Sequence, residues 1–205
     1  MKKSILLPIA IFLLCTTIQA MAQAISEGNV LICAGYGFPN LLGAVFNAYE
    51  TEEGYKATSI GPVYVKGEYL VTDNIGIGIN VAWANTNVKY QIDGFDSVFN
   101  TVPYEYKIKR STYSILGRVN FHFGSSDKFD PYAGLGLGYR NANWSFSNND
   151  PNSISTGSIP NLVPFGFELT LGAHYFFTDV IGAYAEIGAS KSPFQIGLTA
   201  KFGGK

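Results

Sequence analysis

The sequence predicts an all-β fold of eight antiparallel strands, and three observations support this prediction. Apolar residues take every second position in run after run of the chain, as in PFQIGLTAKF at residues 193–202. Side chains of a strand alternate between the two faces of a sheet, so each such run has one apolar face and one face that is polar or bare. Only 14% of the residues are charged, against roughly 25% in soluble domains. Aromatic residues reach 15% and glycine numbers 23. A surface that faces water normally carries more charge than this composition provides.

The strand-like runs and their connections have a regular order. The runs cover residues 29–38, 63–69, 75–84, 113–122, 133–140, 165–174, 181–188 and 193–202. Short turns follow the second, fourth and sixth runs, at Asp73-Asn74, Ser126-Asp127 and Asp179. Longer loops, at residues 39–59, 91–109 and 148–163, follow the first, third and fifth runs, while the last connection, residues 191–193, is short. Short turns at one end and long loops at the other are typical of an up-and-down transmembrane β-barrel.

The first 22 residues have the composition of a secretory signal peptide. Lys2 and Lys3 precede an apolar stretch, and Ala20-Met21-Ala22 supplies small residues for cleavage after Ala22. The prediction is therefore a signal peptide at residues 1–22 and a single outer-membrane barrel domain at residues 23–205. Cys33 would be the only cysteine left after cleavage, and we expect it to be a small buried side chain rather than half of a disulfide.

Two architectures fit eight alternating strands in an exported protein. In a soluble barrel of lipocalin type the apolar face points inward, whereas in a membrane barrel it faces lipid. The opposite face decides between them because it is rich in glycine, which weakens a strand that faces water but fits the crowded interior of a narrow barrel. These glycines are Gly76, Gly78, Gly134, Gly136, Gly138, Gly166, Gly172, Gly182, Gly188 and Gly197. The sequence favours the membrane barrel, with the soluble barrel as the less favoured alternative.

Aromatic residues on the apolar face group near the two ends of the strands. Near the short turns they are Tyr69, Phe121, Phe123, Tyr175 and Phe202; near the long loops they are Tyr36, Trp83, Tyr113, Tyr139, Phe165 and Phe194. Aromatic side chains concentrate where a membrane meets water. We expect two aromatic girdles, one at each membrane interface.

Three segments carry a resemblance to a known family. PYAGLGLGYR at residues 131–140, FFTDVIGAYAEIG at residues 176–188 and QIGLTAKF at residues 195–202 resemble the small outer-membrane β-barrels of the OmpA and OmpX type. The resemblance covers essentially the whole chain after the signal peptide. It implies an integral protein of the bacterial outer membrane, surrounded by lipid. It also implies that Phe202, an aromatic residue at the end of the last strand, is part of the signal that the barrel-assembly machinery reads, although Gly203-Gly204-Lys205 follow it.

Six charged residues fall on the predicted interior face: Lys66, Glu68, Arg118, Arg140, Glu168 and Glu186. Three are cationic and three are carboxylates. Because a buried charge persists only when it is paired and hydrogen-bonded, we expect them to form an interior ion network. The alternative is that these charges line a path for small solutes, which would make the protein a narrow, porin-like channel.

Catalytic and cofactor functions find little support in the sequence. His122 and His174 lie near the short-turn ends on the predicted interior face, where lumen hydrogen bonding is expected, and no metal-binding spacing accompanies them. We expect no catalytic residues, no metal and no other cofactor. A formal net charge of −1 gives no reason to expect a nucleic-acid partner.

The expected protein is thus a monomeric, non-catalytic envelope component whose external loops provide an adhesive or binding surface. The first long loop contains the apolar residues Leu41, Leu42, Val45 and Phe46. They would either form such a surface or pack over the mouth of the barrel.

Overall fold

The computed structural model describes residues 23–48, 54–95, 98–124, 126–151, 153, 157–159 and 163–204. The predicted signal peptide, residues 1–22, lies outside the described residues. The elements in chain order are β1 (Asn29–Phe38), α2 (Leu41–Asn47), β2 (Lys56–Leu70), β3 (Ile75–Phe95), β4 (Thr101–His122), β5 (Phe129–Asn148), β6 (Gly157–Ile159), β7 (Phe165–Phe176), β8 (Ile181–Ala189) and β9 (Phe194–Gly203). No helix within these ranges is long and apolar enough to cross a membrane.

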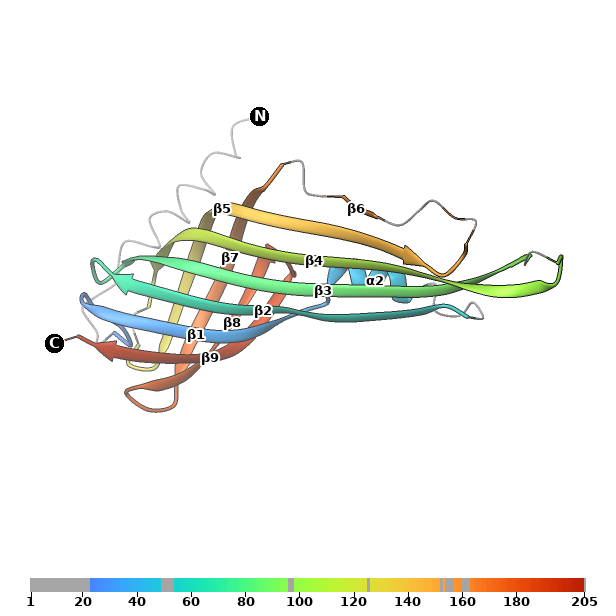
Figure 1. Ribbon diagram of the computed structural model, residues 1–205. Coiled ribbons are helices and arrows are strands. Elements are labelled where there is room, and N and C mark those ends of the chain that lie inside the picture. Colours follow the sequence, from blue (N-terminus) through green and yellow to red (C-terminus); the bar gives the residue numbers. More distant parts are fainter. Residues whose placement is uncertain are drawn as a thin grey trace, which may run out of the picture.

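Eight of the strands close into a ring, which confirms the predicted antiparallel barrel. Each strand pairs with its neighbours in the order β1, β2, β3, β4, β5, β7, β8 and β9, and β9 pairs again with β1. The three-residue strand β6 pairs with β5 outside this ring (Figure 1). The connections β2–β3, β4–β5 and β7–β8 lie at the end of the barrel where β1 starts and β9 finishes (Figure 1). The other connections lie at the opposite end, which we call the outer end because it carries the long loops.

Strands β2, β3, β4 and β5 run well beyond the barrel at the outer end (Figure 1). Strands β1, β7, β8 and β9 have 9 to 12 residues, close to the roughly 9–11 that span a bilayer. Strands β2 to β5 have 15 to 22 residues. Their excess length forms a second, open sheet, which we call the external sheet: residues 56–60, 84–95, 101–112 and 140–148, with β6 along one edge.

The external sheet corrects the prediction of a long loop at residues 91–109. Strands β3 and β4 pair without interruption from Ile75↔Phe121 to Phe95↔Thr101, so only five residues connect them. The predicted loop at residues 39–59 likewise contains α2 and the start of β2, and the loop at residues 148–163 contains β6. An extended hairpin satisfies its own backbone hydrogen bonds, and it can therefore continue as a strand outside the membrane.

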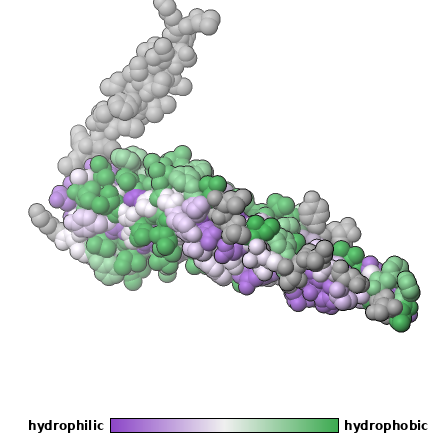
Figure 2. Space-filling model, turned by 45° about the horizontal axis from the view of Figure 1, so that its top comes forward, coloured by the Kyte–Doolittle hydropathy of each residue, from purple (hydrophilic) through white to green (hydrophobic). Residues whose placement is uncertain are grey.

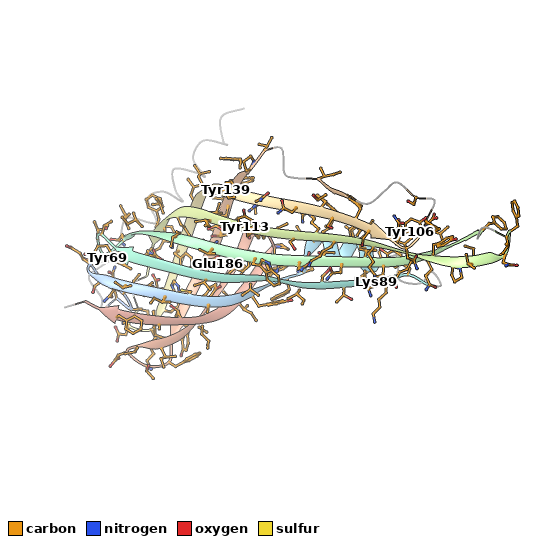
Figure 3. The ribbon with its side chains drawn as sticks, in the orientation of Figure 1. Tyr69, Lys89, Tyr106, Tyr113, Tyr139 and Glu186 are labelled. Atoms are coloured by element: carbon orange, nitrogen blue, oxygen red, sulfur yellow. The ribbon has the colours of Figure 1, made fainter. Side chains whose placement is uncertain are left out.

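The apolar faces of the barrel strands point outward and the glycine-rich faces point inward, as predicted. Leu135 and Ile196 are 48% and 54% exposed, whereas Glu168 and Thr170 are each 1% exposed. The predicted girdle residues are all exposed on the outer surface, and Tyr69 lies at the opposite end of the barrel from Tyr113 and Tyr139 (Figure 3). Hydrophobic side chains dominate the barrel part of the surface and hydrophilic ones much of the external sheet (Figure 2).

The interior glycines make room for charged side chains. A Cβ atom on Gly136 would lie 2.6 Å from Cγ of Glu168, and one on Gly172 would lie 2.7 Å from Cγ of Glu186. Each of these contacts is shorter than real Cβ atoms make. The bare strand face is thus occupied by side chains that reach across from neighbouring strands.

Helix α2 lies at the outer end of the barrel. The side chain of Asn40 caps it by accepting a hydrogen bond from the backbone N–H of Gly43 at 3.2 Å. Gly43 is buried, while Leu41 and Val45 are exposed and line a cavity at the barrel mouth. The apolar residues of the first loop therefore belong to a helix at the mouth.

Candidate functional site

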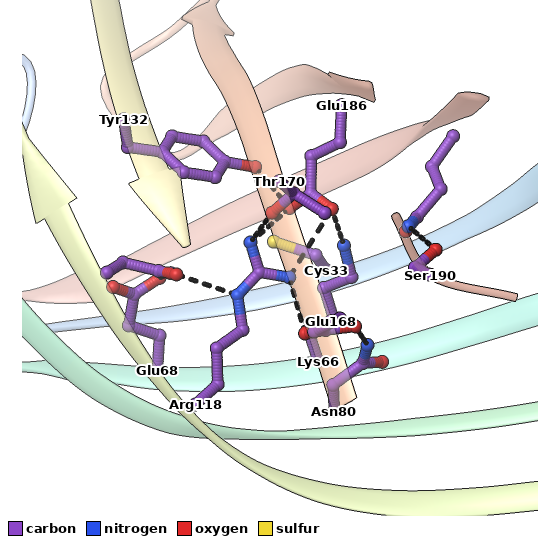
Figure 4. Close-up of polar contacts among 12 residues, drawn as sticks. Cys33, Lys66, Glu68, Asn80, Arg118, Tyr132, Glu168, Thr170, Glu186 and Ser190 are labelled. Atoms are coloured by element: carbon purple, nitrogen blue, oxygen red, sulfur yellow. Dashed lines mark hydrogen bonds and ion pairs between the residues drawn. The ribbon is translucent and has the colours of Figure 1, made fainter. Parts of the chain in front are cut away.

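Glu186 on β8 is the centre of an ion network inside the barrel (Figure 4). Its Oε2 accepts from Nζ of Lys66 on β2 at 2.6 Å, and its Oε1 accepts from a terminal nitrogen of Arg118 on β4 at 2.6 Å. The hydroxyl of Tyr132 on β5 donates to the same Oε1 at 2.7 Å. Three strands on different sides of the barrel are therefore joined through one carboxylate.

Arg118 extends the network to the other side chains of the interior. Its guanidinium donates to Glu168 at 3.2 Å and to the hydroxyl of Thr170 at 3.0 Å, both on β7. Asn80 on β3 donates to the second oxygen of Glu168 at 2.7 Å. Lys66, Arg118, Glu168 and Glu186 are 6%, 5%, 1% and 2% exposed. Two buried cations thus balance two buried carboxylates, the condition under which such charges persist.

A second cluster lies on the short-turn side of the first. Nδ1 of His122 lies 2.8 Å from Oδ2 of Asp130, and Nε2 of His122 lies 2.8 Å from Glu68. Asp130 also contacts Nδ1 of His174 at 3.1 Å. An imidazole donates from both ring nitrogens only in its charged form, so this geometry fits a protonated His122. Asn120 links the two clusters, because it donates to Glu68 and accepts from Arg118.

The His122, Asp130 and His174 group also has the donor atoms of a metal site. One ligand atom from each residue lies within 4.8 Å of the others, and two imidazoles with a carboxylate are a familiar ligand set for zinc. A metal ion would have to replace the hydrogen bonds that Asp130 makes to both histidines. The described contacts are those of a hydrogen-bonded cluster.

One series of contacts resembles a catalytic triad. In it Cys33 contacts His174 and His174 contacts Asp130, as a nucleophile contacts its base and the base contacts an orienting acid. The sulfur of Cys33 lies 3.8 Å from Nε2 of His174, and it also contacts the hydroxyl of Thr199 at 3.3 Å. All three residues of this series are buried, at 5%, 1% and 1% exposure. The cavity beside Cys33 and His174 measures only about 10 Å³, which is space for one water molecule. The arrangement therefore has no room for a substrate.

The structure brings together five of the six charged residues expected in the interior network. Lys66, Arg118, Glu168 and Glu186 are in direct contact, and Glu68 joins them through Asn120. Arg140 lies four positions beyond Gly136 on β5, toward the outer end, and donates to the carbonyl of Phe167 at 3.1 Å. There it lines the cavity at the barrel mouth together with Arg110 and Lys191.

Several members of the two clusters were missing from the sequence prediction. They are Asn80, Asn120, Asp130, Tyr132 and Thr170. His122 and His174 make hydrogen bonds in the interior, as the sequence predicts for them. The alternation of strand side chains could have found Asp130 and Tyr132. Every second residue of a strand faces the same side, and these two continue the inward-facing series of Gly134 and Gly136 on β5. The predicted strand began too late, at Ala133, to include them.

Phe202 lies near the end of β9, opposite Val30 of β1. It is 49% exposed on the outer surface of the barrel, in the girdle nearer the chain termini.

A closed barrel with an apolar exterior, aromatic girdles and a charged, packed interior defines an integral β-barrel protein of an outer membrane. The sequence profile of the outer membrane protein beta-barrel domain family matches residues 9–202. The chain belongs to this family, and hence to the proteins of the bacterial outer membrane.

Solved structures of small outer-membrane barrels are similar to the chain at low identity. Ail, the attachment invasion locus protein of Yersinia pestis, is 14% identical with a TM-score of 0.44, covering 86% of this chain and 99% of Ail. OprG from Pseudomonas aeruginosa is 14% identical with a TM-score of 0.45, covering 89% of this chain and 100% of OprG. The N-terminal β-barrel domain of OprF from Pseudomonas aeruginosa is 17% identical with a TM-score of 0.40, covering 87% of this chain and 98% of that domain. No curated protein matches the chain.

Proposed function

We propose that the protein is a non-catalytic, non-conducting barrel that holds a binding surface outside the outer membrane. The packed ion network supports the proposal that the barrel does not conduct ions. Side chains from β2, β3, β4, β5, β7 and β8 meet in it, and the cavity among them is about 10 Å³. A hydrated ion needs a continuous wet path, and a barrel of eight strands is just wide enough for its own side chains. The narrow-channel alternative requires this network to open.

Conductance across planar bilayers tests this part of the proposal. We expect the purified protein to insert without producing steady open-pore currents, because the Glu186 cluster blocks the interior. Replacing Arg118 and Glu168 by alanine in one variant removes two side chains from the plug, and we expect this variant to show brief current steps that the native protein lacks. Steady currents from the native protein would support the channel alternative instead.

The absence of catalysis is proposed on the same grounds. The thiol of Cys33 and the imidazole of His174 are buried beside the network, in the membrane-spanning part of the barrel. A reaction there would require a substrate to enter a space no larger than a water molecule.

The binding surface is the external sheet and above all its tip. The β3–β4 hairpin ends in a cluster of exposed apolar side chains, Ile92, Phe95, Val98 and Phe99, which are 52%, 63%, 72% and 87% exposed. Hydrophobic surface reappears at this far end of the molecule, beyond the hydrophilic part of the sheet (Figure 2). Several large apolar side chains exposed together are typical of a contact site for a second surface.

Adhesion to an apolar test surface measures the role of this tip. We expect bacteria that produce the protein to attach to hexadecane droplets several-fold more than bacteria producing a variant with Ile92, Phe95, Val98 and Phe99 all replaced by serine. The matched control carries serine at Lys56, Lys89, Lys107 and Lys109, which lie on the exposed face of the sheet but outside the tip. Equal attachment by the native protein and the tip variant would refute the role of the tip.

Biogenesis follows from the same architecture. We propose that residues 1–22 direct export and are then removed, and that Phe202 is read by the barrel-assembly machinery. The exposed position of its ring at the end of β9 supports this role. We further propose that the barrel works as a monomer, because the ring is complete within one chain.

A further inference from the structure

A cavity of about 400 Å³ opens at the outer end of the barrel, above the ion network. Helix α2 contributes the apolar residues Leu41, Leu42 and Val45 to its wall. The remaining wall comes from strands β2 to β5, including the base of the external sheet, and from the short β8–β9 connection. Cavities of this size hold small organic ligands, and this one is separate from the apolar tip of the external sheet.

Three cationic side chains from three different elements line this cavity. Arg110 comes from β4, Arg140 from β5 and Lys191 from the β8–β9 connection. No carboxylate is found among the described residues that line it. The positive charges of Arg140 and Arg110 act on Lys191 and disfavour its charged form, because like charges repel one another at short range. An anion bound among them would offset this repulsion.

The side chains of the cavity are held in defined positions. Lys191 donates to the hydroxyl of Thr112 at 3.1 Å, and the guanidinium carbon of Arg110 lies 5.3 Å from the ring centre of Trp144. Nε of Arg110 is buried and has no hydrogen-bond partner within the described part of the chain. A buried donor without an acceptor is unfavourable, and an anion in the cavity would supply one.

We infer that this cavity is a binding site for a small organic phosphate or sulfate ester taken from outside the cell. The tetrahedral anion would lie among Arg110, Arg140 and Lys191, and its apolar group would lie against Trp144 and α2. Two guanidinium groups and an ammonium group offer more donors than the two oxygens of a carboxylate can accept at once, whereas a phosphate or sulfate ester offers three free oxygens. The packed network below closes the site on the periplasmic side.

The charge of Lys191 makes the site sensitive to pH. Burial, together with the nearby positive charges of Arg140 and Arg110, lowers the pKa of Lys191 to about 7. Arg110 faces it from β4 and Arg140 from β5, while the parts of α2, β2 and β3 that line the cavity present no charged side chain. Lys191 gains its proton as the pH falls through 7, so anion binding should strengthen as the pH falls and weaken as it rises.

Trp144 provides a direct measurement, because the chain has only two tryptophans and the other, Trp83, lies in the outer girdle. We use the Trp83→Phe variant as the parent, in detergent micelles, and titrate it with phenyl phosphate, phenyl sulfate or benzoate. We expect a saturable change of Trp144 emission with both esters and binding of benzoate about ten-fold weaker. In the same parent, Lys191→Gln and Arg110→Gln should each weaken phenyl sulfate binding about ten-fold or more. Lys89→Gln is the matched control, since Lys89 is an exposed cation outside the cavity, and it should leave binding unchanged.

The pH dependence supplies a second readout. Phenyl sulfate does not titrate in this range, so its binding to the parent should strengthen about ten-fold between pH 8.5 and pH 5.5. The Lys191→Arg variant keeps its charge throughout and should give a flat profile. The heat-dependent mobility shift of a folded barrel in gels verifies the fold of each variant. The inference is overturned if the folded parent shows no saturable change with either ester. It is equally overturned if Lys89→Gln weakens binding as much as Lys191→Gln, or if Lys191→Arg keeps the pH profile of the parent.

Discussion

Replacing Glu186 by glutamine is expected to lower the free energy of unfolding by about 3–5 kcal/mol. Glu186 accepts short hydrogen bonds from Lys66, Arg118 and Tyr132. Glutamine keeps the volume but removes the negative charge. Within the described part of the chain, this leaves Lys66 without a carboxylate in direct contact and Arg118 with Glu168 alone. An uncompensated buried cation is strongly destabilising, because neither water nor a counter-ion reaches it.

The chain offers a matched control for this substitution. Glu105 and Lys107 form an ion pair of the same length, 2.6 Å, but their side chains are 35% and 49% exposed. Glu105→Gln should leave the free energy of unfolding nearly unchanged, since exposed pairs contribute little. Urea-induced unfolding of both variants in lipid vesicles, followed by tryptophan emission, measures the difference.

A second variant tests whether charge balance is the cause. Adding Lys66→Met to Glu186→Gln leaves one cation, Arg118, facing one carboxylate, Glu168. We expect this double variant to regain part of the stability that the single variant loses, a non-additive result expected only of residues in contact. If Glu186→Gln and Glu105→Gln cost the same, the interior is hydrated and the plugged barrel is wrong.

Strand parity predicts which side chains face the interior but not the height at which they meet. Lys66, Arg118, Arg140 and Glu186 all have the correct parity, and all four point away from lipid. Which of them touch depends on the tilt and stagger of the strands, which the alternation within one strand does not determine. The register opposes Arg118 to Gly136, and Arg140 lies four residues further along β5, toward the outer end.

The external sheet was predictable in part. Tyr90 and Ile92 alternate with polar residues on β3, as Tyr104 and Tyr106 do on β4, and the rings of Tyr90 and Tyr106 stack with centroids 5.4 Å apart. The period of two was therefore present in the predicted loop. The polar residues between them, with Asp93-Gly94, resemble a turn, and only the pairing of β3 with β4 shows that the strands continue.

Replacing Leu135 by arginine is expected to destabilise the barrel in a lipid bilayer by about 2–4 kcal/mol. Leu135 is 48% exposed and lies midway along the membrane-spanning part of β5, between Phe129 near the short turns and Tyr139 near the mouth. An arginine there faces hydrocarbon, and its charge must either reach an interface or draw water into the bilayer. The measurement is the urea midpoint of the variant in phosphatidylcholine vesicles.

The cost should depend on depth, because lipid rather than protein surrounds the side chain. Ile181, the first residue of β8, is also exposed, at 52%, but it lies at the short-turn end of the barrel. Ile181→Arg should cost only about 0–1 kcal/mol, since its charge is already near the interface. Equal effects at the two positions would mean that the apolar exterior does not lie in a bilayer. A larger cost at Leu135 than at Ile181 would show that the apolar face of the strands lies in a bilayer. Only a hydrocarbon layer makes the cost of an outward-facing arginine depend on its depth.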